Sequence, residues 1–281
     1  MTGFFINDLH IDQWTDARAT STSTAKYRKL LEKWCIPADC LFLAGDVACS
    51  VNAIYCTFMV LKDMYRHIFY VYGNHELRLS DEDMKRGTSY DKRERIETFL
   101  HTATFDERKK VDMLSILKGR DALFEGVSVL GGMGYADLSA SSDRESSIEK
   151  WKSSSDCQRF KLGWSTDLSE IASYENSVIA ESASTLTDVV MTHFGPKQLV
   201  EKDKKLIEQG LDYGLSTFDG SKVLRKLSAE RTIWHYGHLH EQFKREYKVL
   251  GKTILALNNS VGSPDKPPKR KLDKSEFLIT L

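Results

Sequence analysis

Net charge, paired cysteine motifs and long hydrophobic runs are all missing from this sequence of 281 residues. Its 40 lysines and arginines are matched by 40 aspartates and glutamates, so no overall field steers the protein toward nucleic acid or an anionic membrane. This balance gives no sign of nucleic-acid binding, although it does not exclude a nucleic-acid substrate. No apolar run approaches the roughly 18 residues that a membrane-spanning helix needs, so we expect no membrane partner.

The cysteines form an odd set of five with no C-x-x-C pair, at Cys35, Cys40, Cys49, Cys56 and Cys157. Such a set favours buried free thiols and a reducing compartment over a disulfide framework. The first candidate functional residue is Asp8, so cleavage of an N-terminal leader would remove that residue as well. We therefore expect no signal peptide and a soluble, cytoplasmic protein.

Five short segments carry oxygen and imidazole donors, and each follows an apolar run typical of a β-strand. The segments are Asp8-Leu9-His10, Gly45-Asp46, Gly73-Asn74-His75-Glu76, Thr192-His193 and Gly237-His238-Leu239-His240. The apolar runs before them are residues 4–6, 40–44, 68–72, 189–191 and 232–236. Taken alone, each donor has a structural explanation, such as a helix cap or a core histidine. Donors at all five strand ends instead indicate a metal site, because a sheet delivers its strand ends side by side.

Strands and helices alternate over residues 4–77, with helices predicted near 25–34 and 51–65. This alternation indicates mainly parallel sheet packing. Residues 127–135 predict a strand that runs into a glycine-rich turn, and residues 243–257 predict further strands.

The five donor segments, in this order, resemble the pattern D-x-H, GD, GNH(E/D), H and GHxH of the calcineurin-like metallophosphoesterase superfamily. The resemblance extends from residue 4 to about residue 260. It implies an α/β fold in which two mixed β-sheets pack face to face in a four-layer α-β-β-α sandwich. The metal site of such a fold lies at the strand ends.

The resemblance also implies a binuclear metal centre. In the superfamily, the first metal takes the equivalents of Asp8, His10, Asp46 and His240. The second metal takes the equivalents of Asp46, Asn74, His193 and His238. Asp46 would thus bridge both ions, and the uncharged Asn74 would keep the second ion electrophilic. We expect two divalent ions, with manganese as the first choice and Fe, Zn, Co or Ni as alternatives, because mixed nitrogen and oxygen ligands accept all of these metals.

The implied chemistry is attack on phosphorus by a metal-bridging hydroxide. Two divalent ions, the carboxylates of Asp8 and Asp46 and one hydroxide leave a net charge of about +1, which suits a phosphate ester. The superfamily equivalent of His75 acts as general acid or stabilises the phosphoryl transition state. Glu76 could orient His75 or cap the next helix, and we favour capping. The remaining histidines fall outside the pattern, at His67, His101 and His235.

The segment Gly45–Ser50 departs from the Ser/Thr protein phosphatases of the superfamily. Those enzymes carry an aspartate that pairs with the catalytic histidine and an arginine that grips phosphate, whereas Cys49 stands at the aspartate position here and the arginine is missing. The resemblance therefore implies a phosphodiesterase or phosphomonoesterase acting on a small phosphate ester, with a nucleotide as one candidate substrate. The alternatives are a single-strand nuclease and a non-catalytic scaffold on the same fold. Scaffold members lack metal ligands, whereas this sequence retains all seven.

We predict a single metallophosphoesterase domain over residues 1–281, with three appended segments. Dense mixed charge over about 78–120 predicts a helical insertion with a pair of solvated surface helices. Residues 139–170 are too long for an ordinary connection, and they predict either a lid that selects substrate or a disordered insertion. The basic, proline-rich residues 264–274 predict an exposed tail.

Overall fold

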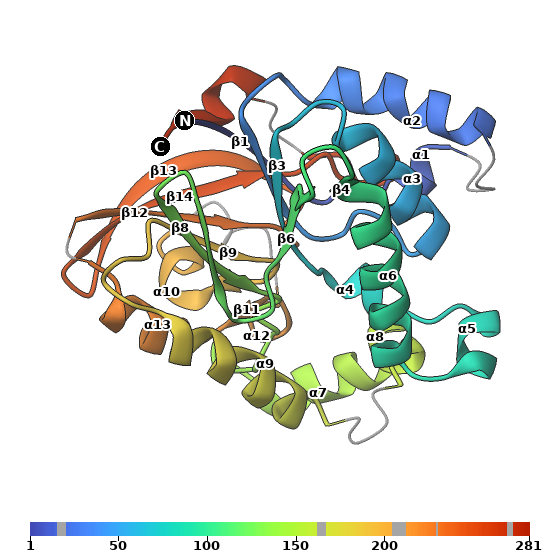
Figure 1. The fold of residues 1–281 in the computed structure, drawn as a ribbon. Coiled ribbons are helices and arrows are strands. Elements are labelled where there is room, and N and C mark those ends of the chain that lie inside the picture. The colour runs from blue at the N-terminus through green and yellow to red at the C-terminus, as the bar shows by residue number, and fades with distance from the viewer. Residues whose placement is uncertain (16–20, 162–166, 204–211, 229, 269–271) are drawn as a thin grey trace.

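The computed structural model describes residues 1–15, 21–161, 167–203, 212–228, 230–268 and 272–281. Within these ranges, two large mixed sheets pack against each other and helices cover their outer faces (Figure 1). No helix in the same ranges is long and apolar enough to cross a membrane. The predicted sandwich of two mixed sheets is confirmed.

The first sheet has five strands in the order β15-β1-β2-β3-β6. They are β1 (Thr2–Ile6), β2 (Cys40–Ala44), β3 (His67–Val71), β6 (Leu114–Ile116) and β15 (Leu278–Thr280). Neighbours pair in parallel from β1 to β6, and β15 pairs antiparallel with β1 at the edge. The crossovers contain α1 (Ile11–Trp14), α2 (Ser21–Trp34) and α3 (Val51–Leu61). Parallel pairing brings the carboxyl ends of β1, β2 and β3 to one edge.

The second sheet has six strands in the order β13-β14-β12-β9-β8-β7. They are β7 (Asp121–Phe124), β8 (Val127–Gly132), β9 (Val189–Thr192), β12 (Arg231–Tyr236), β13 (Gln242–Val249) and β14 (Lys252–Asn259). The four central strands pair in parallel, and the two edge strands are antiparallel. Both the predicted strand within 127–135 and the predicted strands within 243–257 are confirmed.

Aromatic side chains from three neighbouring strands stack in the layer between the sheets. The ring centroids of Phe5 and Phe42 are 4.4 Å apart, and those of Phe42 and Phe69 are 5.0 Å apart. Val189 and Leu257 of the second sheet belong to the same buried cluster. The two sheets therefore share one core.

Helices bury the opposite face of each sheet. Against the first sheet, α3 and α6 (Ser89–Thr104) pack on alternate strand residues, so that Leu100 shares a cluster with Phe4 and Tyr70. Against the second sheet, Ile179 of α9 (Leu168–Ser182) shares a cluster with Leu130. Strands buried on both faces explain why the sequence shows continuous apolar runs instead of alternation.

The charged segment 78–120 contains two helices, as predicted, but its structure differs in two respects. The helices are α5 (Asp81–Arg86) and α6, and α6 buries one face, including the whole side chain of Lys92. Residues 107–110 form a turn between β4 (Phe105–Asp106) and β5 (Val111–Asp112) in place of a helix. Charge density alone therefore does not distinguish a solvated helix from one that packs on the sheet.

The segment 139–170 folds into short helices over its described part. They are α7 (Arg144–Ser153) and α8 (Ser155–Arg159), and residues 162–166 lie outside the described residues. Trp151 and Phe160 are buried and face Tyr135, with ring centroids 6.0 and 5.8 Å away. These contacts tie the helices to the core, so a disordered insertion is the wrong description of residues 144–160.

Short elements complete the second half of the chain. They are β10 (Gly195–Pro196), α10 (Lys197–Val200), α12 (Tyr213–Ser216), β11 (Thr217–Phe218), α13 (Ser221–Lys226) and the 3₁₀ helix η1 (Lys274–Phe277).

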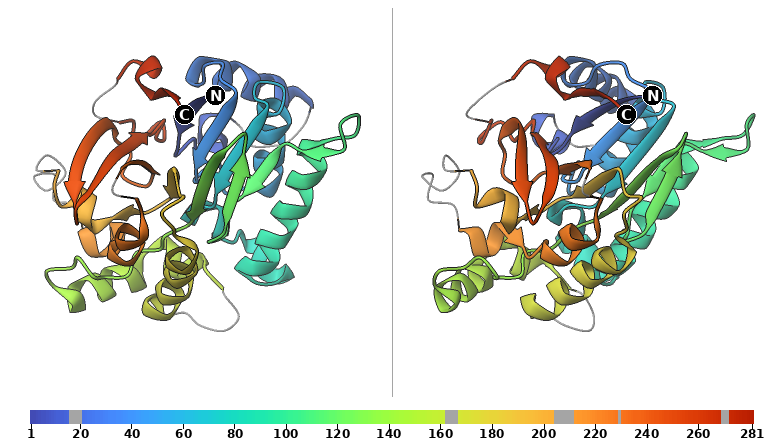
Figure 2. Two further views of the ribbon diagram at one scale, coloured as in Figure 1. Left: turned by 60° about the vertical axis from the view of Figure 1, so that its left-hand side comes forward. Right: turned by 90° about the vertical axis from the view of Figure 1, so that its left-hand side faces the viewer.

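Most described residues of the predicted tail over 264–274 are exposed, at positions 264–267 and 273, but the chain beyond it returns to the first sheet. Residues 269–271 lie outside the described residues, η1 follows them, and β15 then pairs with β1. The two termini consequently lie side by side in every view (Figure 1, Figure 2). Sequence patterns missed this pairing because its partner strand lies at the other end of the chain.

Candidate metal centre

The carboxyl ends of five strands meet at one place. Asp8 follows β1, Asp46 follows β2, Asn74 follows β3, His193 follows β9 and His238 follows β12. His10 and His240 lie two residues beyond the first and last of these strand-end donors. The structure therefore brings all seven predicted ligands together, with His75 beside them.

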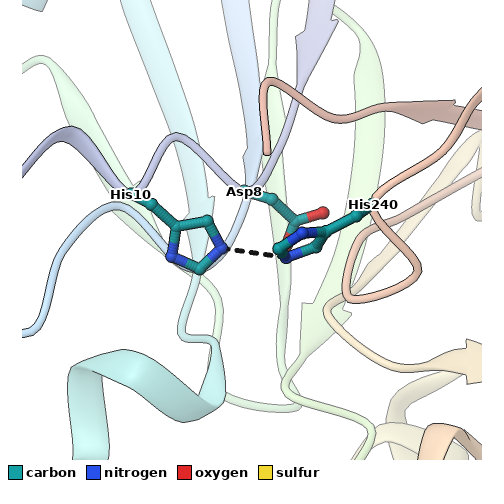
Figure 3. A group of neighbouring side chains, drawn as sticks. All are labelled: Asp8, His10 and His240. Carbon is teal, nitrogen blue, oxygen red and sulfur yellow. Dashed lines mark hydrogen bonds between the residues drawn. The ribbon is translucent and has the colours of Figure 1, made fainter. Parts of the chain in front are cut away.

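One group of donors consists of Asp8, His10 and His240, whose donor atoms lie within 4.8 Å of one another (Figure 3). Nε2 of His10 is 3.0 Å from Nε2 of His240. Nδ1 of His240 lies 3.3 Å from the carbonyl oxygen of Lys266. Since that oxygen can only accept, Nδ1 carries the proton and Nε2 keeps a lone pair for a metal.

A second group consists of Asp46, His193 and His238, again with donor atoms within 4.8 Å of one another. Oδ1 of Asn74 lies 2.9 Å from Nε2 of His193 and 3.3 Å from Nδ1 of His238. Nδ1 of His193 donates to the carbonyl oxygen of Ala44 at 3.0 Å. That bond turns Nε2 of His193 toward the group, where a bound metal ion would take the place of its proton.

The carboxylate of Asp46 lies between the two groups. Its Oδ1 is 3.4 Å from Nε2 of His193, and its Oδ2 is 3.7 Å from Nε2 of His10. Burial raises the pKa of Asp46, but the nearby imidazoles of His193, His75 and His10 outweigh burial and hold that pKa well below its ordinary value. Conversely, burial lowers the pKa of His193, while Asp46 raises it to about 9. One carboxylate facing two donor groups is the geometry that a bridging ligand requires.

The backbone at the donors adopts the left-handed region, which residues other than glycine rarely occupy. Nine such residues have positive φ among the described residues, and five of them are predicted ligands. These five are Asp8, His10, Asp46, His238 and His240, with φ between 41° and 66°. Such conformations cost roughly 1–3 kcal/mol each and cluster at functional sites. The strained backbone at these five residues therefore lowers the stability of the fold and directs their side chains toward the centre.

Two glycines in the motifs are required by close approach of the ligand loops. A Cβ atom on Gly73 would lie 2.1 Å from Oδ1 of Asp46. Gly45 has a φ of +79°, and a Cβ there would lie 2.7 Å from Nδ1 of His193. A side chain at either position would displace a donor from the centre.

Glu76 holds two of the loops together. Its carboxylate is fully buried and accepts hydrogen bonds from the backbone N–H groups of Gly73, Asp46 and Val47, at 2.8, 3.1 and 2.6 Å. The bond from Gly73 caps α4 (Asn74–Leu77), as we favoured from the sequence. The sequence analysis did not predict the other two bonds, which come from the loop after β2.

The ring nitrogens of His75 lie within hydrogen-bond distance of two side chains among the described residues. Nδ1 lies 3.2 Å from Sγ of Cys49, and Nε2 lies 2.6 Å from Nη1 of Arg78. Burial lowers the pKa of His75 to about 3, so the ring is neutral at pH 7. Arg78 follows His75 by three residues, which is close to one helical turn. This spacing is the signal in the sequence that could have identified Arg78.

Two further charged residues support the surroundings of His75, and the sequence analysis did not identify them. The carboxylate of Asp156 in α8 accepts from Nδ2 of Asn74 and from Nε of Arg78. The ammonium group of Lys92 donates to the backbone carbonyl oxygens of Cys49 and Arg78. Lys92 thus ties together the backbones of both neighbours of His75.

A cavity of about 830 Å³ opens over the two donor groups, and His10, Asp46, His75 and His240 lie in its wall. A second cavity of about 790 Å³ lies beside it, and Cys49 lines that one. The side chains of Arg78 and Ser155 line both cavities.

The histidines outside the motifs also lie outside this centre. His235 is buried between the carbonyl oxygens of Ile6 and Leu257. His67 contacts Ser115, and the exposed His101 pairs with Asp112.

Three comparisons with known proteins bear on the identity of the chain. The profile of the calcineurin-like phosphoesterase family matches residues 1–242. A search of curated protein sequences gives no match. Among solved structures, the phosphopantetheinyl hydrolase PptH of Mycobacterium tuberculosis has a TM-score of 0.67 at 16% identity, over 99% of this chain and 94% of that chain.

Two other solved structures have lower TM-scores and serve only as weaker likenesses. The protein of unknown function AQ665 from Aquifex aeolicus has a TM-score of 0.26 at 16% identity, over 73% of this chain and 86% of that one. The sulfate thiohydrolase SoxB from Thermus thermophilus has a TM-score of 0.33 at 14% identity, over 92% and 51%. The family profile covers most of the sequence and includes all five donor segments. This chain is therefore a member of the calcineurin-like phosphoesterase family, whose members hydrolyse phosphate esters with divalent metal ions.

Proposed function

We propose that this protein is a binuclear metal phosphodiesterase acting on a small phosphate diester. Family membership supports metal-dependent hydrolysis of a phosphate ester, and the position of Asp46 between two donor groups supports two ions. One ion would be held by Asp8, His10, Asp46 and His240, and the other by Asp46, Asn74, His193 and His238. When bound, the ions would supply electrophilic stabilisation of the phosphoryl oxygens and water of lowered pKa.

The donor set fits a hard or borderline divalent ion. It consists of carboxylate and amide oxygens and imidazole nitrogens, while the nearest thiol, Cys49, faces His75. Manganese, iron, zinc, cobalt and nickel all accept such ligands. We keep manganese as the first metal to test.

Arg78 and His75 would act on the phosphoryl group. A guanidinium group matches two phosphate oxygens at once, and Arg78 lies in the cavity wall beside His75. A phosphate that binds Arg78 would draw the guanidinium group away from Nε2 of His75. It would also place negative charge near the imidazole ring. Both changes favour the protonated imidazole. His75 would then hold a proton at Nε2 for the leaving oxygen.

The observation that carries the diester assignment is the pair of cavities that meet at Arg78 and Ser155. A monoester extends from phosphorus on one side only, whereas a diester needs room for two substituents. With the phosphoryl group over the donors, one substituent would occupy the cavity of about 830 Å³. The other would pass Arg78 into the cavity of about 790 Å³.

The name of the structural relative adds a substrate to test. PptH is a phosphopantetheinyl hydrolase, and its likeness to this chain is one of fold at 16% identity. We therefore include a substrate carrying a phosphopantetheinyl group beside linear and cyclic nucleotides. A nucleotide remains one candidate, and the cavities set no preference between the two classes.

Hydrolysis of bis(p-nitrophenyl) phosphate and of p-nitrophenyl phosphate by the same preparation tests the proposal. The protein is first stripped of metal and then supplied with Mn²⁺, with Asp46→Asn as the inactive control. We expect metal-restored turnover that favours the diester, and two ions per chain by elemental analysis. Turnover of the monoester alone would refute the diester assignment. Two bound ions with no turnover across the substrate screen would indicate a scaffold, and cleavage confined to single-stranded DNA would indicate a nuclease.

A further inference from the structure

A carboxylate from outside the five motifs contacts both a predicted metal ligand and the arginine beside His75. Asp156 lies in α8, within the segment 139–170, and is 8% exposed. Its Oδ2 lies 3.1 Å from Nδ2 of Asn74, and its Oδ1 accepts from Nε of Arg78. One short helix thus supplies a single side chain that contacts a predicted metal ligand and the arginine beside His75.

The contact with Asn74 fixes which end of its amide faces the metal centre. A carboxylate only accepts, so the amide nitrogen must point toward Asp156. The amide oxygen then points toward His193 and His238, at 2.9 and 3.3 Å from their ring nitrogens. Without Asp156, a rotation of the amide by half a turn would present an N–H₂ group, which cannot bind a cation.

The contact with Arg78 fixes the orientation of its guanidinium group. Asp156 holds Nε, and Nη1 then lies 2.6 Å from Nε2 of His75. No other carboxylate among the described residues forms an ion pair with Arg78. The position of Arg78 in the wall shared by the two cavities therefore depends on Asp156.

We propose that Asp156 is a positioning residue that sets the oxygen of Asn74 toward the second metal ion and holds Arg78 in the wall shared by the two cavities, where it can bind the phosphoryl group. The inference rests on the proposed function, because it gives both contacts a role in phosphate-ester hydrolysis. It assigns a role to the segment 139–170 that differs from a lid: this segment supports the centre through one buried carboxylate. Outer contacts of this kind are typically worth 10- to 100-fold in metal affinity or activity.

Two substitutions separate the two contacts. Asp156→Asn keeps an amide oxygen that can accept from Asn74, but it loses the charge that holds Arg78. Asp156→Ala loses both contacts. Glu149→Gln is the matched control, since Glu149 pairs with Lys152 on the exposed surface of the adjacent helix α7 and lines neither cavity.

The decisive measurement is calorimetric titration of each metal-free variant with Mn²⁺, which requires no turnover. For Asp156→Ala we expect the affinity of one of the two ions to fall by about 10- to 100-fold, with the other ion unchanged. Asp156→Asn should retain both affinities within about threefold but lower kcat for the diester by about tenfold or more. Adding Asp156→Asn to Arg78→Met should then cause little further loss, because Asp156 acts on kcat through Arg78.

Equal effects of Asp156→Ala and Glu149→Gln on both ions would overturn the inference. A merely structural carboxylate would lower the melting temperature and weaken both ions alike, which would also overturn it. If Asp156→Ala does not fold, a kcat of wild-type size in the isosteric Asp156→Asn decides against the contact with Arg78. If the proposed function is wrong, the wild-type protein will be inactive on every diester. In that case, a selective loss of affinity for one ion in Asp156→Ala would still support the contact with Asn74.

Discussion

Nη1 of Arg78 lies 2.6 Å from Nε2 of His75, and this contact assigns the proton of the imidazole ring. A guanidinium group only donates, so Nε2 is the acceptor and the ring proton resides on Nδ1, which faces Sγ of Cys49 at 3.2 Å. Arg78, the residue directly after α4, thus places an arginine beside His75 although the segment Gly45–Ser50 contains none.

Arg78→Met should lower kcat by about 100-fold or more and raise KM, because one charged donor to a transition state is worth that much. Arg78→Lys should recover only part of the loss, since an ammonium group cannot pair with two phosphate oxygens in a fixed plane. Steady-state kinetics on the diester checks this, with Arg28→Met as a control for an exposed arginine paired with Asp63. Full activity of Arg78→Met would contradict the role.

Metal binding and catalysis should respond separately to two substitutions. Asp46→Asn removes the charge that faces both donor groups, so we expect lower metal content and no hydrolysis. His75→Ala leaves every proposed ligand in place, so both ions should remain while kcat falls by about 10²- to 10⁴-fold. Elemental analysis of each purified variant, beside its kinetics, distinguishes the two outcomes. Full activity of Asp46→Asn would exclude a binuclear centre.

Glu76→Gln should destabilise the metal-free protein by about 1–3 kcal/mol, because an amide cannot accept from three backbone donors as a carboxylate does. Gly73, Asp46 and Val47 supply those donors. Burial raises the pKa of Glu76 to about 7. Urea unfolding at pH 8, where the carboxylate is charged, gives the cleanest comparison. A shift no larger than that of an exposed variant such as Glu149→Gln would show that Glu76 does not anchor the loops.

His67 should make the protein less stable in acid. Burial lowers its pKa to about 4 from 6.5, so the unfolded chain binds a proton that the folded protein does not. Stability is unaffected by this group above pH 6.5, and it declines as the pH falls toward 4, by about 1.4 kcal/mol per pKa unit. Urea midpoints at pH 7, 6 and 5 for the wild type and His67→Gln provide the test. Parallel pH profiles for the two proteins would contradict the lowered pKa.

The sequence by itself determined the family, the two mixed sheets and the converging donors. Each donor segment directly follows an apolar strand, and the carboxyl ends of parallel strands meet at one edge. The positions of Asp8, Asp46 and His193 therefore follow from local order alone. The motifs also contain glycines such as Gly73. Only the structure shows that Gly73 leaves room for the side chain of Asp46.

The tertiary structure alone decided what surrounds those donors. Asp156 and Lys92 come from helices outside the motifs, and no periodicity predicts which charged residue of a helix turns inward. The carbonyl oxygen of Lys266 reaches His240 through a loop whose composition indicated an exposed tail. Ligands at strand ends follow from the pattern of one strand, whereas these supporting contacts depend on how separate elements pack, which local sequence does not encode.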